Sequence, residues 1–567
     1  MLRYIFMGVI IMSASQLFAE DLPASIDTGR IMVNQHSNTM AIDKQPNQAL
    51  QSAKKNIPRS APRGSDAISL ELSSITFEGM TAFAAADFEA YLSNLYNKKL
   101  PSSALWDAAD FITQSYLDAG YFLSRARIPQ QEINAGSAKI VVIEGYISEI
   151  NLQNSEQYNP QKISQPSLMV AHVIEDLKSK KPLRAIDLES ALLKLSNIYG
   201  IEFEALLHRV EDGLDGQVAL TLNQKKSASR GIIALNNHGS KFTGPLRANI
   251  AVEHFFAQGQ KTSINGLVSL PSDELWSIGA VHSMQLSPLL EVDLLLSKSD
   301  SIPGDSLQQS NIKSDSTSAG IHFNWTLIRQ RTKNLTLGFG LDALDSQTEI
   351  ASTPLTHDKT RVARFSLDYD FYDDALGLNT FNLKLSQGLS VLGASKAADS
   401  NLSRQGAKPN FTKLWASFNH QKYLNNDFLL SAQIQGQVAS MPLYSSEEFG
   451  FGGAYLGRAY DDSEITGDHG VAASLELQYT GFGPVINVQV KPFIFYDIGK
   501  AWNKGDANIK RISASSAGIG LRASGNSGLG FNSTLAFPLT KEVDNALYGD
   551  KKSPTLRFGL TYRFNLN

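Results

Sequence analysis

The chain has 567 residues and a formal net charge of -4, with 51 basic and 55 acidic side chains. This near balance indicates neither a nucleic-acid partner nor attraction to an anionic membrane surface. The sequence contains no cysteine, which excludes disulfide frameworks and thiolate metal sites. The length allows several domains, or one large barrel with appended domains.

Residues 1–19 have the pattern of a secretory signal peptide. Arg3 supplies the positive charge, residues 4–12 form an apolar run, and Leu17-Phe18-Ala19 fits a cleavage site. The run is too short to cross a bilayer as a helix. Residues 20–66 lack sustained periodicity and end in a linker-like stretch at 54–65, preceded by one short helix expected within 26–42.

Residues 67–145 and 146–227 repeat one order of elements, a strand, two amphipathic helices and two strands. In the first unit these are expected at 68–77, 84–96, 102–119, 121–128 and 138–144. In the second they are expected at 147–151, 167–177, 186–199, 202–209 and 217–225. Ser102 or Ser103 is the expected N-cap of the long helix, and Gly120 and Gly200 are expected helix stops. A repeated βααββ unit is typical of a binding module rather than an enzyme domain.

The first unit carries a motif that resembles a known domain. It runs Ile112-Thr113-Gln114-Ser115-Tyr116-Leu117-Asp118-Ala119-Gly120-Tyr121, then Ala126-Arg127-Ile128-Pro129-Gln130-Gln131 and Val142-Ile143-Glu144-Gly145-Tyr146-Ile147. This resembles a POTRA domain of the two-partner secretion transporters (TpsB), the ShlB/FhaC/HecB-type outer-membrane proteins, which each export one large adhesin, haemolysin or toxin. The signature positions are Tyr116, Gly120, Tyr121, Pro129, Glu144 and Gly145. A generic α+β repeat is the alternative interpretation.

Residues 228–567 alternate apolar and polar side chains, segment after segment. In 430–438, for example, Leu430, Ala432 and Ile434 share one face of a strand, while Gln433 and Gln435 take the other. After the signal, no run of about 18 apolar residues predicts a membrane-spanning helix. Strand-plus-turn units of about 21 residues predict roughly 16 antiparallel strands, an even number, as in bacterial outer-membrane barrels. The family resemblance implies sixteen strands as well.

One of these strands predicts a lumenal carboxylate. In 486–498 the apolar face includes Ile494, Tyr496 and Ile498, so Asp497 must face the lumen by counting alone. An unpaired carboxylate on the lipid face would be costly, which favours the same register. Phe495 and Gly499 share the face of Asp497.

A long, polar, glycine-rich loop is expected at about 447–470, with Arg458 at its centre. If the loop folds into the lumen, Arg458 and Asp497 can form a charge-assisted pair that fixes the loop to the wall. Such an arrangement is the geometry of a gated pore.

The family resemblance extends to this loop and wall. Arg458-Ala459-Tyr460 is similar to the Arg-Gly-Tyr/Phe tip of the family's sixth extracellular loop, and Phe495-Tyr496-Asp497-Ile498-Gly499 to its Phe-x-Asp-x-Gly wall motif. Alanine replaces the middle glycine, so Gly457 is expected to take over part of any need for positive φ. Glu464, Gly467 and Asp468 resemble the acidic, glycine-containing continuation of the loop. The resemblance also implies a plug helix in the N-terminal segment.

The resemblance implies an outer-membrane translocator, with its POTRA domains in the periplasm. It would export a large exoprotein that carries a two-partner secretion domain, without nucleotide hydrolysis. A lumen of Ser, Gln, Asn and scattered charges solvates an extended chain, and a sheet edge at 121–128 or 202–209 would receive that chain by strand addition. Outer-membrane lipid and the barrel-assembly machinery are the other expected partners. No nucleic acid, cofactor or metal is expected.

The main alternative is a barrel- or translocation-assembly protein, although such proteins carry a larger number of repeats. A passive porin is the third hypothesis, and two POTRA-like repeats are not porin anatomy. We expect no catalytic residues, because Gly259-Gln260-Lys261-Thr262 lacks the Gly-Lys step of a phosphate loop and no nucleophile or zinc motif is present. The exoprotein's identity, the receiving edge and the oligomeric state stay open. The last strand is expected to end near Phe564, unless the assembly signal is internal.

Overall fold

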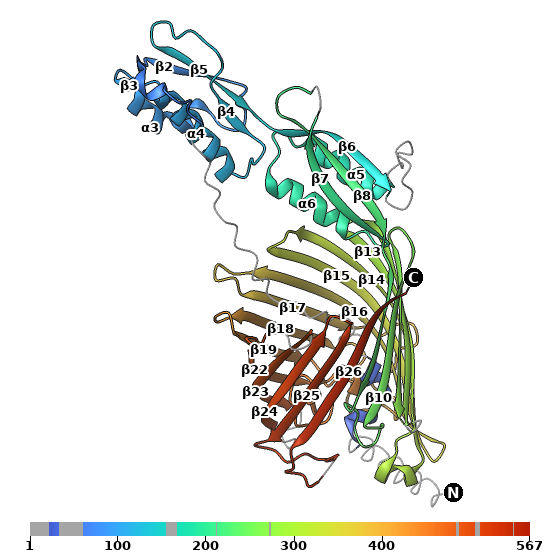
Figure 1. Cartoon of the computed structure of the whole chain (residues 1–567). Coiled ribbons are helices and arrows are strands. Elements are labelled where there is room, and N and C mark those ends of the chain that lie inside the picture. The colour runs from blue at the N-terminus through green and yellow to red at the C-terminus, as the bar shows by residue number, and fades with distance from the viewer. Residues whose placement is uncertain are drawn as a thin grey trace, which may run out of the picture. The chain divides into compact units, whose positions relative to one another are not determined.

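A computed structural model describes residues 22–32, 60–154, 167–210, 213–270, 274–483, 487–504, 511–547 and 549–566. The expected signal peptide and its cleavage site lie outside these residues. The chain forms two compact units, one of Ala49–Ser227 with Arg329–Arg331 and one of Met1–Gln48, Ala228–Ile328 and Thr332–Asn567. Figure 1 shows the helices of the first unit and the strands of the second.

The first α+β repeat contains β1 (Ser69–Glu71), β2 (Ser74–Glu78), α3 (Glu89–Leu92), β3 (Lys99–Pro101), α4 (Ser103–Asp118), β4 (Arg125–Arg127) and β5 (Ser137–Ile143). Its sheet has the order β2-β5-β4, and β1 pairs separately with β3. The buried face of α4 carries Ala108, Ile112 and Tyr116 at helical spacing. The helix expected at 84–96 is instead broken into two 3-10 turns, Ala85–Phe88 and Ser93–Leu95, around the single turn of α3.

The ends of α4 test the expected caps. Ser102 stands at the N-cap position, yet its hydroxyl donates to the Ser65 carbonyl at 2.7 Å and does not cap the helix. The expected N-cap position is therefore confirmed, but the capping hydrogen bond is not formed, because the hydroxyl ties the helix to the preceding chain instead. Gly120 ends the helix with a φ of +91°, and the Tyr121 amide donates back to the Tyr116 carbonyl at 2.8 Å.

The second repeat contains β6 (Tyr146–Asn154), α5 (Leu168–Ser179), α6 (Ala185–Ser196), β7 (Ile201–Arg209) and β8 (Gln217–Lys226), with sheet order β6-β8-β7. It has its own apolar core. The two repeats are joined by backbone bonds, because the Leu183 and Ala185 amides donate to the Gly145 and Gly120 carbonyls at 2.9 and 2.8 Å.

The strands of the second unit close into a barrel (Figure 1). They are β9 (Ser229–Asn236), β10 (Leu246–Ala257), β11 (Gln260–Leu270), β12 (Leu275–Ser287), β13 (Leu290–Ser301), β14 (Ile312–Arg329), β15 (Lys333–Ile350), β16 (Thr353–Tyr372), β17 (Leu378–Gly388), β18 (Thr412–Tyr423), β19 (Phe428–Ala439), β22 (His469–Tyr479), β23 (Val488–Trp502), β24 (Ile512–Gly525), β25 (Leu529–Pro538) and β26 (Thr555–Leu566). The predicted barrel of 16 strands is confirmed for the described part of the chain.

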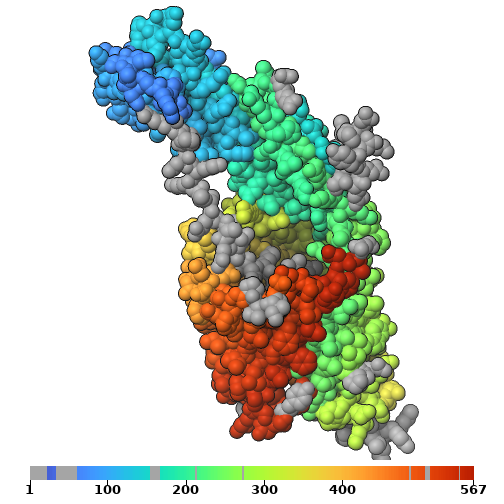
Figure 2. Space-filling model, in the orientation of Figure 1, coloured from blue at the N-terminus to red at the C-terminus, as the bar shows by residue number. Residues whose placement is uncertain are grey.

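We call the barrel end at which β9 begins and β26 ends the proximal end, and the opposite end the distal end. Strand β26 continues to Leu566, so the last strand does not stop near Phe564. It pairs with β9 along a seam, which Figure 2 shows as the line where the red and green surfaces meet.

Side-chain exposure on β23 follows the predicted parity. Ile494, Tyr496 and Ile498 are 56%, 44% and 47% exposed on the outside of the barrel, whereas Phe495 and Asp497 are buried inside it. The cause is the two-residue period of a strand between lipid and lumen.

Candidate functional site in the barrel lumen

The long distal loop folds back into the barrel. It connects β19 to β22 through residues 440–468, starting earlier than expected, and we call it loop 6. Within it β20 (Phe449–Phe451) and β21 (Ile465–Gly467) form a short hairpin, and the segment between them carries Arg458. Gly457 has a φ of +73°, and a Cβ there would lie 2.8 Å from the Phe451 ring. The left-handed conformation at the tip therefore falls on Gly457, while Ala459 is absent from the described residues with positive φ.

Arg458 and Asp497 lie together inside the barrel, and both are buried. The guanidinium Nε and Nη2 atoms lie 3.3 Å from the two carboxylate oxygens. The backbone amides of Gly457 and Arg458 each donate to Asp497 Oδ2 at 3.0 Å. Ser474 donates to Oδ1 at 2.7 Å. Asp497 thus binds the backbone of the tip as well as the arginine side chain.

Glu476 is the nearer acid to the guanidinium. Arg458 Nη1 lies 2.7 Å from Glu476 Oε2, and Arg522 binds the same carboxylate from β24. Sequence reasoning missed Glu476, although a signal was present. Val471 and Leu475 face outward, so the alternation of the strand places Glu476 on the lumenal face. Glu476 also lies opposite Phe495 in the pairing of β22 with β23.

Each of the three specified residues of the wall motif, Phe495, Asp497 and Gly499, makes a contact that explains its type. The Phe495 ring lies under the guanidinium, 3.9 Å from Cζ to the ring centroid, in a cation–π contact. Asp497 accepts the hydrogen bonds of the tip. At Gly499, a Cβ would lie 2.2 Å from the Phe451 ring, so only glycine lets the loop hairpin pack against β23.

The rest of the tip is held through its backbone. Arg557, on β26, donates to the Arg458 carbonyl at 3.0 Å and to the Tyr460 carbonyl at 2.6 Å. The Tyr460 hydroxyl lies 3.0 and 2.9 Å from the Ser515 and Lys541 carbonyls. Arg557 was also missed, because its strand is distant in sequence and its role depends on barrel closure.

Comparison with known proteins agrees with this architecture. Residues 288–523 match the family model of haemolysin secretion/activation proteins ShlB/FhaC/HecB, and residues 70–145 match the ShlB-type POTRA domain. The barrel and the first repeat of this chain are thus both similar to transporters of the ShlB/FhaC/HecB type. The two-partner secretion resemblance of the sequence motifs is therefore confirmed, and this transporter is an outer-membrane protein with periplasmic POTRA domains.

Relatives of the transporter include the heme/hemopexin transporter protein HuxB of Haemophilus influenzae (strain 86-028NP), 24% identical over 499 residues and covering 80% of this chain and 81% of HuxB. The outer membrane transporter CdiB of Escherichia coli is 22% identical over 471 residues, covering 78% and 76%. The solved structure of CdiB from Escherichia coli has a TM-score of 0.71 at 19% identity, covering 94% and 98%. That of CdiB from Acinetobacter baumannii has a TM-score of 0.62 at 16% identity, covering 94% and 97%.

The continuation residues of loop 6 bind charged and backbone groups of the transporter. Glu464 pairs with Lys541 at 3.0 Å and accepts from the Asp544 amide at 2.8 Å. Asp468 pairs with Arg404 at 2.6 Å. A Cβ at Gly467 would lie 2.9 Å from the backbone of Trp502. These contacts fix the arm of loop 6 that leads from its tip to β22.

The base of loop 6 meets the N-terminal segment. Residues 28–32 are helical, and Thr28 Oγ1 lies 2.6 Å from Ser316 Oγ on the barrel wall. Arg30 pairs at 2.7 Å with Glu448. The neighbouring Glu447 pairs with Arg364 at 2.6 Å. The N-terminal segment and loop 6 therefore share one ionic network inside the barrel.

The POTRA signature residues lie in the Ala49–Ser227 unit, where they form hydrogen bonds and packing contacts within the repeats. Glu144 accepts from the Tyr116 hydroxyl at 2.6 Å and from the Thr81 and Ala82 amides at 2.7 and 2.8 Å. A Cβ at Gly145 would lie 2.4 Å from the Leu123 side chain. Tyr121 packs against the core of the first repeat, and Pro129 follows β4 and is half-buried.

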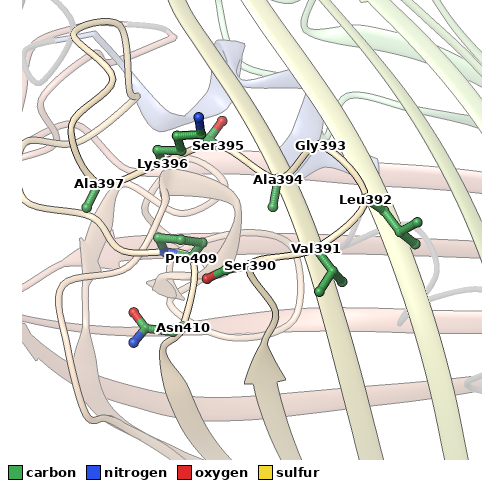
Figure 3. A pocket seen from close by; sticks show the side chains of 10 residues that line it. All are labelled: Ser390, Val391, Leu392, Gly393, Ala394, Ser395, Lys396, Ala397, Pro409 and Asn410. Atoms are coloured by element: carbon green, nitrogen blue, oxygen red, sulfur yellow. The ribbon is translucent and has the colours of Figure 1, made fainter.

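Metal-ligand groups, membrane-spanning helices and pockets are the other candidate functional features of the described residues. They contain no group of three or more His, Cys, Asp or Glu that could hold a metal ion, and no helix among them is long and apolar enough to cross a membrane. An open pocket in the β17–β18 connection is lined by Val391, Leu392, Lys396 and Pro409, among others (Figure 3). None of the predicted site residues lines it.

Proposed function

We propose that this transporter exports one large partner exoprotein through the barrel lumen, and that loop 6 is its gate. The observation that carries this proposal is the tip of loop 6, where Arg458 is bound by Asp497 and Glu476 inside the barrel. The names of HuxB and CdiB, both transporters, support the same function.

The contacts of the tip suit reversible displacement. If Arg458 leaves, Glu476 keeps its ion pair with Arg522, and Asp497 keeps the hydrogen bond from Ser474. Neither acid is left without a partner, which removes most of the penalty of breaking a buried pair. A passenger can therefore displace the loop by local rearrangement, and no nucleotide hydrolysis is part of the proposal.

The two three-stranded sheets of the periplasmic unit have four edge strands, and we propose two of them, β4 and β7, as candidates for binding the passenger. β4 and β7 each pair on one side only among the described strands. β4 has three residues and β7 has nine, so β7 gives the longer row of backbone groups for strand addition. We propose a haemolysin, adhesin or toxin as the passenger, outer-membrane lipid around the barrel, and insertion by the barrel-assembly machinery.

The seam bears on the alternative, an assembly factor that releases its clients sideways. β26 pairs with β9 over eight registered residues, as many as it shares with β25 on its other side. The Phe564 ring covers Gly231, where a Cβ would lie 2.3 Å from it. A fully paired seam favours passage along the lumen.

Deletion of this chain in its native host tests the proposal. We expect one large exoprotein to disappear from the medium, while the levels of other outer-membrane proteins stay normal. A general loss of outer-membrane barrels would support the assembly alternative instead. Normal exoproteins with reduced uptake of small solutes would support a porin.

A further inference from the structure

One part of the lumen wall has a row of uncharged polar side chains. On β19 the side chains of Ile434 and Val438 point outward and are 50% and 52% exposed. The alternate residues, Gln433, Gln435 and Gln437, therefore face the lumen. Across the sheet Gln433 pairs with Asn419, Gln435 with Ser417, and Ser417 with Asn382. We call this set the amide row, which consists of Asn382, Ser417, Asn419, Gln433, Gln435 and Gln437.

The distal end of the amide row already binds polypeptide backbone. Gln437 Nε2 donates to the Glu447 carbonyl at 3.0 Å and to the Asp468 carbonyl at 3.2 Å, one on each arm of loop 6. Lys413 donates to the same Glu447 carbonyl at 2.9 Å. The resting loop thus lies across the last member of the row.

Ser417 donates to Asn382 Oδ1 at 3.2 Å and Asn382 donates to Asp368 at 2.6 Å, whereas the two glutamines of the row on the proximal side of Gln437 are not bound by protein groups of the described residues. Within the residues that the structure describes, the Gln433 and Gln435 amides make no side-chain hydrogen bond and are only half-buried. Below them, Gln421 Oε1 is buried without a partner. Hydrogen-bonding capacity is therefore free along the wall that leads from the proximal end to loop 6.

We propose that the amide row is the track on which the backbone of the extended passenger crosses the barrel, and that loop 6 covers its distal end at rest. The proposal rests on the exporter function above. Each amide both donates and accepts, so it fits the backbone of any passenger sequence. Gln433, Gln435 and Gln437 repeat every second residue, about 7 Å apart, which is also the repeat of an extended chain beside them. Because each bond is weak and uncharged, the chain can pass from one amide to the next.

Single-cysteine crosslinking tests the track, since the native chain has no cysteine. The variants are Gln433→Cys and Gln435→Cys, with Asn265→Cys as the matched control. Asn265 is also a half-buried lumenal amide, and β11 lies eight strands from β19 in either direction around the barrel. The probe is the exoprotein identified by the deletion experiment, given single cysteines and arrested by a folded domain fused to its C-terminus.

We expect about tenfold more disulfide adduct with the β19 variants than with Asn265→Cys, the preference that one or two backbone hydrogen bonds supply. Equal adduct on both walls, with secretion of the unfused exoprotein intact, would overturn the track and leave the exporter function standing. Absence of any exoprotein that depends on this chain would overturn both.

A second measurement replaces the amides without adding thiols. Gln433→Leu combined with Gln435→Leu should slow secretion about tenfold, while Asn265→Leu keeps the wild-type rate. Heat-modifiable mobility in electrophoresis establishes that each barrel is folded. Wild-type secretion by the folded double variant would contradict the proposal.

Discussion

At the scale of single residues, the site is built around one arginine whose charge cannot be removed. Its planar guanidinium contacts Asp497, Glu476 and the Phe495 ring at once. A lysine offers a point charge and cannot match this set of directions. The site therefore uses both the planar geometry and the charge of Arg458, so we expect that lysine cannot replace it.

We predict that Arg458→Ala and Asp497→Ala abolish secretion while the barrel still inserts. Loss of the pair weakens the docked loop by about 2 kcal/mol, less than for a fully isolated pair because Arg522 stays on Glu476, so its resting position is lost. Immunoblots of medium and outer membrane measure both outcomes. Lys552→Ala, at an exposed loop charge, is the control and should secrete normally. Unchanged export by both site variants would show that the ion pair is dispensable.

Loop 6 also carries a pH-sensitive residue. Burial raises the pKa of Asp461 to about 6, despite the opposing charge of Arg557, and the charges of Glu464 and Asp462 act in the same direction as burial. The protonated carboxyl favours the docked loop fully below the unfolded pKa of about 4, and this contribution is lost as the pH rises through about 6.

We therefore predict that channel openings in planar bilayers are rarer at about pH 5 than at about pH 7.5. Asp461→Asn should remove most of this difference, because its amide stays neutral at both pH values. A pH response of the variant equal to that of wild type would assign the effect to another group.

At the scale of elements, the N-terminal segment and loop 6 are two inserts held by one wall and by each other. Arg30 of the segment pairs with Glu448 at the base of the loop, and Arg404 reaches the same glutamate from the β17–β18 connection at 3.1 Å. Both inserts fill lumen that a passenger needs. Release of one insert should therefore weaken the hold on the other.

We predict that Arg30→Ala increases the frequency of channel openings. The lost charge-assisted bond contributes about 2 kcal/mol, which corresponds to roughly 30-fold in the ratio of released to docked segment. Single-channel recording of the purified protein measures this ratio. Arg63→Ala, in the exposed linker outside the barrel unit, is the control. Unaltered opening statistics would show that the segment is held without Arg30.

At the scale of the whole molecule, the closed wall decides the route of a passenger. All sixteen strands of the described barrel pair with two neighbours, and the seam is as long as the β25–β26 pairing beside it. The lumen, with its charged network and amide row, is then the one path that leaves the wall intact.

We predict that a disulfide across the seam leaves secretion unchanged. Ile233→Cys and Tyr562→Cys change residues that face each other in the β9–β26 register, where opposed Cβ atoms lie about 5 Å apart. Formation of the bond is read from electrophoretic mobility, and reduction provides the control state. Secretion that returns only on reduction would mean that the passenger leaves through an opened seam.

The fold class was accessible from the sequence because lipid and lumen make opposite demands on successive side chains. The parity around Asp497 and the even strand number both follow from that period. The local details were less accessible. Ser102 forms a tertiary hydrogen bond instead of a cap, and the helix expected at 84–96 breaks, since these outcomes depend on neighbours that are distant in sequence.

The sequence by itself determined that alternating strands form an outer-membrane barrel after two POTRA repeats, that Asp497 faces the lumen, and that Arg458 lies in a long loop. Tertiary structure decided the rest of the site. Glu476, Arg522 and Arg557 come from strands whose register and closure bring them to the tip of loop 6. Strand periodicity is a local property that each segment carries alone, whereas the partners of a buried charge depend on which strands become neighbours when the sheet closes.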